Sequence, residues 1–339
     1  MTSFKKESKV SWSICPKYVP AEGTTRFRLV SYNMLAQSDI QLPYFSYTPP
    51  GCLDWMNRSK ATLTLLRELR SDFLCLQELD AYDFYKTKLE TYGYYSVYIQ
   101  RDGKEPDGCG IFYKHNVAEL LIEDTIKYND LLELCHDDDD LGRDCVGIMG
   151  AFRLRGAPAN HVVIVANTHI FWDPWLSHVQ FAQAKYLTQR LAEFKTLVSK
   201  KFGCVEPSMI VAGDFNSVPN SMVYQYLISS HPDSKLWIEN NEVVVEVEYF
   251  KEPAPMALGS VYAVANGREP KFTYCNQEFE YTLDYIFFSP SRLITPISVL
   301  KLPDSTDSAD VIGGLPNFYH PSDHLPLAIE FEIRKIKYA

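Results

Sequence analysis

The sequence predicts a layered α/β fold that forms a single domain. Short apolar runs typical of buried strands recur along the chain, amphipathic stretches with helical spacing lie between them, and no long linker divides them. The 339 residues are enough to bury a sizeable core. Several of the apolar runs end in a polar residue, which favours a functional site along one edge of the sheets.

Runs dense in valine, isoleucine and leucine predict the buried strands. In chain order they are FRLVSYN (27–33), DFLCLQE (72–78), GCGIFYK (108–114), HVVIVANTH (161–169), SMIVAGDFN (208–216), YTLDYIFFS (281–289) and LPLAIEFEI (325–333).

Two longer stretches predict helices. We expect Asn57 to cap RSKATLTLLRELR and Ser177 to cap HVQFAQAKYLTQRLAEFKTLVSKK. The second stretch has apolar residues at steps of three and four, the pattern of a helix packed on a sheet: Phe181, Ala184, Leu187, Leu191, Phe194 and Val198. The acidic run HDDDD (136–140) is expected to be a solvated loop, because no EF-hand spacing surrounds it.

Composition restricts the classes of function. The net charge is −10, with 33 basic and 43 acidic residues, so the chain is not expected to bind long nucleic acids mainly through phosphate neutralisation. No apolar run approaches the roughly 20 residues that a membrane helix needs. The eight cysteines are scattered and include no C-x-x-C pair, which favours reduced core thiols over a zinc module or a disulfide scaffold. The first residues lack a secretory signal, so we expect a cytoplasmic protein, with an organelle as the alternative.

Polar side chains that can do chemistry stand at or beside the ends of the predicted strands. They are Asn33, Glu78, His169, Asp214, Asn216, Asp284, Asp323 and His324. Carboxylates gathered at one sheet edge repel one another unless a cation joins them, and oxygen donors without cysteine suit Mg²⁺ or Mn²⁺. Histidines beside such a cation are typical of phosphoester hydrolysis.

The order of the motifs SYNMLAQ, LQELD, DGCGIFYK, ANTHIFWDP, VAGDFNSVPNS, YTLDYIFFS and HPSDHLPLAIEF resembles the endonuclease/exonuclease/phosphatase superfamily. Within it, the motifs are similar to the deadenylase branch that contains carbon catabolite repressor four, nocturnin and angel. The resemblance covers roughly residues 26–334 and implies a four-layer α/β sandwich, in which two facing, mostly antiparallel sheets are flanked by helices. Residues 1–25 would then be an N-terminal extension and 335–339 a C-terminal tail.

The resemblance implies a site for Mg²⁺, with two ions and with Mn²⁺ able to substitute. Glu78 would be the principal metal ligand, Asp323 a further ligand, and Asn33 would lie close to the second ion or its water.

The resemblance also implies the catalytic roles. Asp214 would orient or activate the attacking water, and Asn216 would hold the scissile phosphate or a metal ion. His324 would contact the phosphate and would be oriented by Asp284, while His169 would stabilise the pentavalent transition state.

Base recognition in the deadenylase branch relies on a proline and a phenylalanine that sandwich an adenine. Pro174 and Phe279 stand at the matching positions. Asn220 and Arg101, with Lys104, could approach phosphates, although a solvated hairpin is the simpler interpretation of the basic pair.

The resemblance implies a Mg²⁺-dependent 3′–5′ exoribonuclease that acts on the 3′ poly(A) of RNA and releases AMP. The alternatives are a nocturnin-like 2′-phosphatase for the small adenine nucleotide NADP(H), a phosphodiesterase for 2′,5′-oligoadenylate, and a non-catalytic RNA-binding module. No lysine or arginine follows His169 until Lys185, which favours poly(A) over NADP(H). Trp172 and Trp175 could extend the stacking surface or only cover the following helix. No leucine-rich repeat is present, so we expect an enzyme that acts without scaffold docking, of undetermined oligomeric state.

Overall fold

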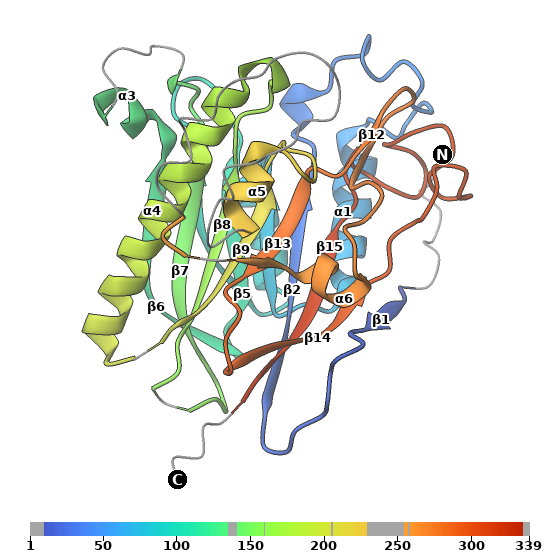
Figure 1. The fold of residues 1–339 in the computed structure, drawn as a ribbon. Helices are drawn as coiled ribbons and strands as arrows, with labels where there is room; N and C mark the ends of the chain where they lie inside the picture. Colours follow the sequence, from blue (N-terminus) through green and yellow to red (C-terminus); the bar gives the residue numbers. More distant parts are fainter. Residues whose placement is uncertain are drawn as a thin grey trace.

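The computed structural model describes residues 10–134, 141–158, 160–204, 206–228, 254–256 and 258–334. The acidic run at 136–140 and the expected C-terminal tail at 335–339 lie outside the described residues. Two facing sheets are flanked by helices on both outer faces, which confirms the four-layer sandwich in one domain (Figure 1).

The first sheet has seven strands in the order β1-β14-β15-β2-β3-β5-β4. Its strands are β1 (Trp12–Ile14), β2 (Thr25–Asn33), β3 (Phe73–Gln77), β4 (Tyr94–Gln100), β5 (Gly108–Lys114), β14 (Ile294–Leu300) and β15 (Leu327–Ile333). Neighbours are antiparallel except β2 and β3. The expected N-terminal extension therefore contributes an edge strand, β1, to this sheet.

The second sheet has six strands in the order β10-β13-β9-β8-β7-β6. Its strands are β6 (Ala118–Lys127), β7 (Val146–Leu154), β8 (Val163–His169), β9 (Ser208–Asp214), β10 (Gly259–Ser260) and β13 (Asp284–Phe288). Here only β8 and β9 are parallel. A separate hairpin pairs β11 (Tyr274–Cys275) with β12 (Glu280–Tyr281).

Helices cover the outer faces of both sheets. On the first sheet lie α1 (Trp55–Leu69) and α2 (Tyr82–Glu90), and on the second lie α4 (Ser177–Phe202) and α5 (Met222–Ile228) (Figure 1). The short elements are η1 (Gln37–Asp39), η2 (Tyr128–Asp130), α3 (Leu131–Leu134), η4 (Pro174–Leu176) and α6 (Val261–Asn266). Among the described residues, no helix is both long and apolar enough to cross a membrane.

The main core lies between the sheets. It is rich in phenylalanine: Phe73 meets Phe27 and Phe152 edge-on, with ring centroids 5.7 Å and 5.1 Å away. The predicted apolar face of α4 is buried against the second sheet along its whole length. The cysteines of the described part of the chain are all buried and free, as expected for reduced core thiols.

The expected helix caps were wrong at both positions. Helix α1 begins at Trp55, and its cap is Asp54, whose carboxylate accepts a hydrogen bond from the backbone N–H of Asn57. Ser177 is the first residue of α4 and makes no capping bond, because the 3-10 turn η4 precedes the helix and is itself capped by Asp173. Helix α2 and strands β4, β6, β7 and β14 were not predicted.

Candidate active site

The parallel strand pairs determine where the site lies. The last residue of β2, Asn33, is in register with Gln77, which immediately precedes Glu78. In the facing sheet, His169 and Asp214 are the last residues of β8 and β9 and are also in register. Because parallel strands end at the same sheet edge, both pairs present polar groups at one end of the sandwich.

Strand β13 completes this end of the sandwich. It runs antiparallel to β9, so its first residue, Asp284, is in register with Asp214. Just below, a polar layer joins the two sheets: Gln77 donates to Asn167 Oδ1 across 2.6 Å, and Asn167 donates to two carbonyls of the first sheet across 2.9 Å each. The carbonyls belong to Leu76 and Gly110. This layer fixes the spacing of the sheets beneath the site.

Asn33 connects two carboxylates. Its Nδ2 donates to Glu78 Oε1 at 2.8 Å and to Asp214 Oδ2 at 2.9 Å, while its Oδ1 accepts from the N–H of Leu35. The second oxygen of Glu78 accepts from the N–H of Ala36 at 2.9 Å. Glu78 has a φ of 50°, in the left-handed region where non-glycine residues are rare and cluster at functional sites. The amide of Asn33 therefore orients both acidic groups.

Burial and mutual repulsion act on the carboxylates of the site. Burial, and then the neighbouring Asp323, raise the pKa of Glu78 to about 8. Burial and the charge of Asp284 also raise the pKa of Asp214. Ligand atoms of Glu78, His169 and Asp214 lie within 4.8 Å of one another, as do those of Asp214, Asp284 and His324.

A divalent cation fits this donor set, because a positive charge among oxygen ligands removes the repulsion that raises the pKa values. Glu78 and Asp214 would hold the cation, which would polarise a phosphoryl oxygen and a water molecule. Asp323 is buried and belongs to neither of these two groups, which were found among the described residues. Its expected role as a metal ligand stays a prediction.

His324 and Asp284 form a buried imidazole–carboxylate pair. His324 Nδ1 lies 2.8 Å from Asp284 Oδ2, which also accepts from the Thr273 hydroxyl. Burial alone would lower the pKa of His324, but the carboxylates of Asp284 and Asp214 raise it well above its usual value. The ring is therefore a cation whose Nε2 faces Asp214 Oδ2 at 3.7 Å. Such a group can donate a hydrogen bond to a phosphate oxygen.

The second histidine has the opposite surroundings. His169 is buried, and burial together with the positive charges of Arg101 and His324 lowers its pKa well below the usual value. Its Nδ1 lies 3.0 Å from the Arg101 guanidinium, and its Nε2 lies 3.1 Å from the amide nitrogen of Asn216. The site thus holds one charged and one neutral imidazole.

Asn216 lies between this histidine and Asp214. Its backbone N–H donates to Asp214 Oδ1 at 2.9 Å, and its φ of 44° is left-handed. Helix α4 supports the turn, because Gln180 donates to the carbonyl of Asn216 at 2.9 Å.

Arg58 anchors the loops of the site and was missed by the sequence analysis. Its guanidinium is buried and donates to the carbonyls of Met34, Leu35 and Pro321 at 2.6–2.8 Å. These loops directly follow Asn33 and contain Asp323. The available signal was that Arg58 is in phase with the buried face of α1, which comprises Ser59, Thr62, Leu65, Leu66 and Leu69. Thr273, which no sequence motif marks, was also missed.

Three of the four residues expected to bind substrate lie on exposed segments. Pro174 begins η4, five residues after His169, and Phe279 lies between β11 and β12 with its side chain 51% exposed and stacked on Tyr281. Asn220 is exposed in the turn before α5, with a left-handed φ of 69°. Arg101, by contrast, is mostly buried, with each of its guanidinium nitrogens facing a protein atom. Contacts of all four with substrate stay predictions.

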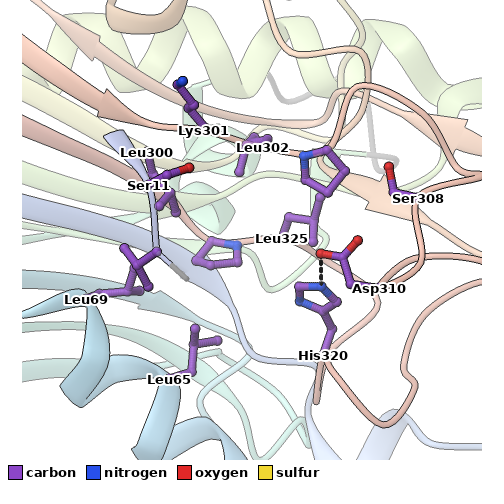
Figure 2. Close-up of a pocket in the computed structure, with 13 residues that line it drawn as sticks. Ser11, Leu65, Leu69, Leu300, Lys301, Leu302, Ser308, Asp310, His320 and Leu325 are labelled. Atoms are coloured by element: carbon purple, nitrogen blue, oxygen red, sulfur yellow. Dashed lines mark ion pairs between the residues drawn. The ribbon is translucent and has the colours of Figure 1, made fainter. Parts of the chain in front are cut away.

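A separate cavity of about 230 Å³ lies beside α1 and β14. It is lined mainly by leucine and proline side chains, with the ion pair of His320 and Asp310 at one side (Figure 2). His320 precedes the Asp323–His324 motif by a few residues, but the carboxylate site itself does not line this cavity.

Two facing sheets that present buried carboxylates, an imidazole–carboxylate pair and a neutral histidine at one end define a class of metal-dependent phosphoesterases. The endonuclease/exonuclease/phosphatase family model matches residues 30–324. The chain belongs to this family, as the motifs indicated.

Among curated proteins, the chain is 49% identical to carbon catabolite repressor protein 4 homolog 4 of Arabidopsis thaliana, over 91% of this chain and 78% of that protein. It is 28% identical to the CCR4-Not complex 3′–5′-exoribonuclease subunit Ccr4 of Debaryomyces hansenii, again over 91% of this chain. The match spans only 39% of that longer relative. The chain is therefore a homologue of the CCR4 type.

Among solved structures, ANGEL2, described as a 2′,3′-cyclic phosphatase in complex with adenosine-2′,3′-vanadate, is similar with a TM-score of 0.75 and 26% identity. The similarity covers 96% of this chain and 99% of that one. The human Nocturnin catalytic domain shares the fold, with a TM-score of 0.63 and 22% identity over 93% of this chain and 97% of that one.

Proposed function

We propose that this protein is a Mg²⁺-dependent 3′–5′ exoribonuclease that shortens 3′ poly(A) and releases AMP. The observation that carries the hydrolytic chemistry is the pair of His324 and Asp284, 2.8 Å apart, beside the Asp214 carboxylate. The named activity of the Ccr4 relative supports action at RNA 3′ ends.

The chain's own residues suit in-line attack on a phosphodiester. The Asp214 carboxylate lies between the Asn33 amide and the His324 ring, where it can accept a proton of the attacking water. The His324 cation faces this carboxylate, and the side-chain amide of Asn216 lies beside His169, so both can bind the phosphate oxygens, on which negative charge grows in the transition state.

The preference for adenine rests on Pro174 and Phe279. Phe279, five residues before Asp284, offers an exposed ring, and stacking on such a ring contributes about 1–3 kcal/mol per base. Trp172 and Trp175 are 66% and 91% exposed next to Pro174. Tryptophans exposed to this extent fit a surface for additional bases better than a cover for the following helix.

A second candidate function is hydrolysis of a 2′,3′-cyclic phosphate at an RNA end. It is favoured by the similarity to ANGEL2, which extends over nearly the whole of both chains. Both reactions are phosphoester hydrolyses at the 3′ end of an RNA and would use the same carboxylates and histidines.

A product assay with Mg²⁺ separates the candidates. Three substrates are offered in parallel: a 5′-labelled RNA with an oligoadenylate 3′ tail, the same RNA with a 2′,3′-cyclic phosphate end, and NADPH. Stepwise shortening with release of AMP supports the proposal. Opening of the cyclic phosphate without shortening supports the second candidate, and release of phosphate from NADPH alone refutes both.

Adenine stacking is tested by Phe279→Ala. We expect KM for the oligoadenylate RNA to rise about 5- to 150-fold, which corresponds to the loss of one stacked base. The matched control is Tyr95→Ala, which removes a 56% exposed ring at the start of β4, at the opposite end of the sheet. An equal KM for both variants would contradict the role of Phe279.

A further inference from the structure

Arg101 lies behind His169 and is itself held in place. Its Nε donates to Asp107 Oδ2 at 2.9 Å, and its backbone N–H donates to the carbonyl of Asp107 at the same distance. With one side of the guanidinium bound in this way, Nη2 reaches His169 Nδ1 at 3.0 Å. The side chain is 15% exposed, so little water competes for the contact.

This contact determines which ring nitrogen of His169 carries the proton. A guanidinium has five N–H donors, no acceptor, and cannot lose its charge in a protein. The Nδ1 atom facing it must therefore be the acceptor, which leaves the hydrogen of the neutral ring on Nε2. Asp214 Oδ2, at 3.6 Å from Nε2, is too distant for a hydrogen bond but places a negative charge on that side of the ring.

One neighbour, Asn216, favours the opposite tautomer, in which Nδ1 carries the proton and Nε2 is bare. The amide nitrogen of Asn216 lies 3.1 Å from His169 Nε2 and would donate to it if Nε2 were bare. That nitrogen already donates to the carbonyl of Ile170 at 2.9 Å. Because a hydrogen bond from a charged donor is roughly twice as strong as one between neutral groups, the contact with Arg101 prevails.

We propose that Arg101 is a positioning residue that fixes the proton of the His169 ring on Nε2. The ring then donates a hydrogen bond to a phosphate oxygen at the site instead of ligating a metal ion through Nε2. Metal ligation would need a bare Nε2 and a proton on Nδ1, pointing directly at the Arg101 cation. Arg101 would then act through His169, whereas its expected contact with phosphate stays a prediction.

The tautomer can be observed in the metal-free protein. Long-range proton–nitrogen correlation spectra of protein with isotope-labelled histidine distinguish protonated from bare ring nitrogens, and a His169→Gln spectrum assigns the signals. We expect bare Nδ1 and protonated Nε2 in the wild type and a mixture of tautomers in Arg101→Met. A protonated Nδ1 in the wild type, or an Arg101→Met spectrum identical to the wild type, would overturn the proposal.

Titration with Mg²⁺ provides a second reading. His169 Nε2 is expected to keep its proton at saturating Mg²⁺. Loss of this proton would show that the ring is a metal ligand and would overturn the proposal. Arg153→Met, which removes an arginine paired with Glu119 on the edge of the second sheet, is the control and should leave the His169 signals unchanged. Unfolding midpoints of all variants verify that they are folded.

The catalytic consequence rests on the proposed function and is measured separately. Arg101→Met is expected to lower kcat on the cleaved substrate about 10- to 100-fold, the loss typical when an outer partner in a metal site is removed, with KM changed much less. Arg101→Lys keeps one donor and should recover part of kcat. A rise in KM at constant kcat would instead indicate a phosphate contact and refute positioning. If the wild type cleaves none of the substrates, the proposed function fails while the spectra still decide the tautomer.

Discussion

The strongest test of how the site is assembled is the removal of Arg58. Its guanidinium makes four hydrogen bonds, to the carbonyls of Met34, Leu35 and Pro321 and to Gln37 Oε1, all between 2.6 and 2.8 Å. Arg58→Met keeps an apolar stem of similar length but deprives three buried carbonyls of their donor.

The expected loss in the free energy of unfolding follows from these three carbonyls. Each unsatisfied buried acceptor costs about 1–3 kcal/mol, and release of a buried charge offsets part of the sum. We therefore expect Arg58→Met to lower the free energy of unfolding by about 3 kcal/mol, measured by urea denaturation of the metal-free protein. Activity should fall as well, because the freed loops directly follow Asn33 and contain Asp323.

The control is Arg67→Met on the same helix. Arg67 is exposed and lies over the Tyr92 ring at 4.9 Å, so its loss should cost less than about 1 kcal/mol. A loss below about 1 kcal/mol for Arg58→Met as well would show that water replaces the guanidinium without cost, and the anchoring argument would be refuted.

Three further predictions follow from the site. The pKa of Glu78 is raised from 4.5 in the unfolded chain to about 8 in the folded, metal-free protein, so ionisation of this carboxylate lowers the free energy of unfolding as pH rises through this range. Glu78→Gln should therefore be more stable than the wild type at alkaline pH. The same variant should lose Mg²⁺ binding, measured by calorimetry. Asp284→Asn should lower the pKa of His324 and move the alkaline limb of the kcat–pH profile to lower pH; an unmoved limb would exclude His324 as the titrating group. A Cβ on Gly213 would lie 2.0 Å from the Thr168 carbonyl of β8, so Gly213→Ala should cost about 1–3 kcal/mol of stability and most of the activity, whereas Gly203→Ala, which meets nothing within 4 Å, should keep its activity.

The sequence by itself determined the α/β class, the seven predicted strands and the identity of the polar strand-end residues. These features are local: buried strands are dense in branched apolar residues, and the motifs around Asp214, Asp284 and His324 are contiguous. Strands β4, β6, β7 and β14 escaped prediction. In β4 and β6 the residues are mostly exposed or half-buried, so their sequences lack a continuous apolar run.

Only the tertiary structure decided which groups act on one another. The pairing of β8 with β9 places His169 beside Asp214, and the packing of the two sheets brings Asn33 within hydrogen-bonding distance of Asp214, 181 residues away. Likewise, the role of Arg101 depends on a ring nitrogen 68 residues further along the chain. Hydrogen bonds are directional and effective only over about 3 Å, so such partners become visible only when the chain is folded.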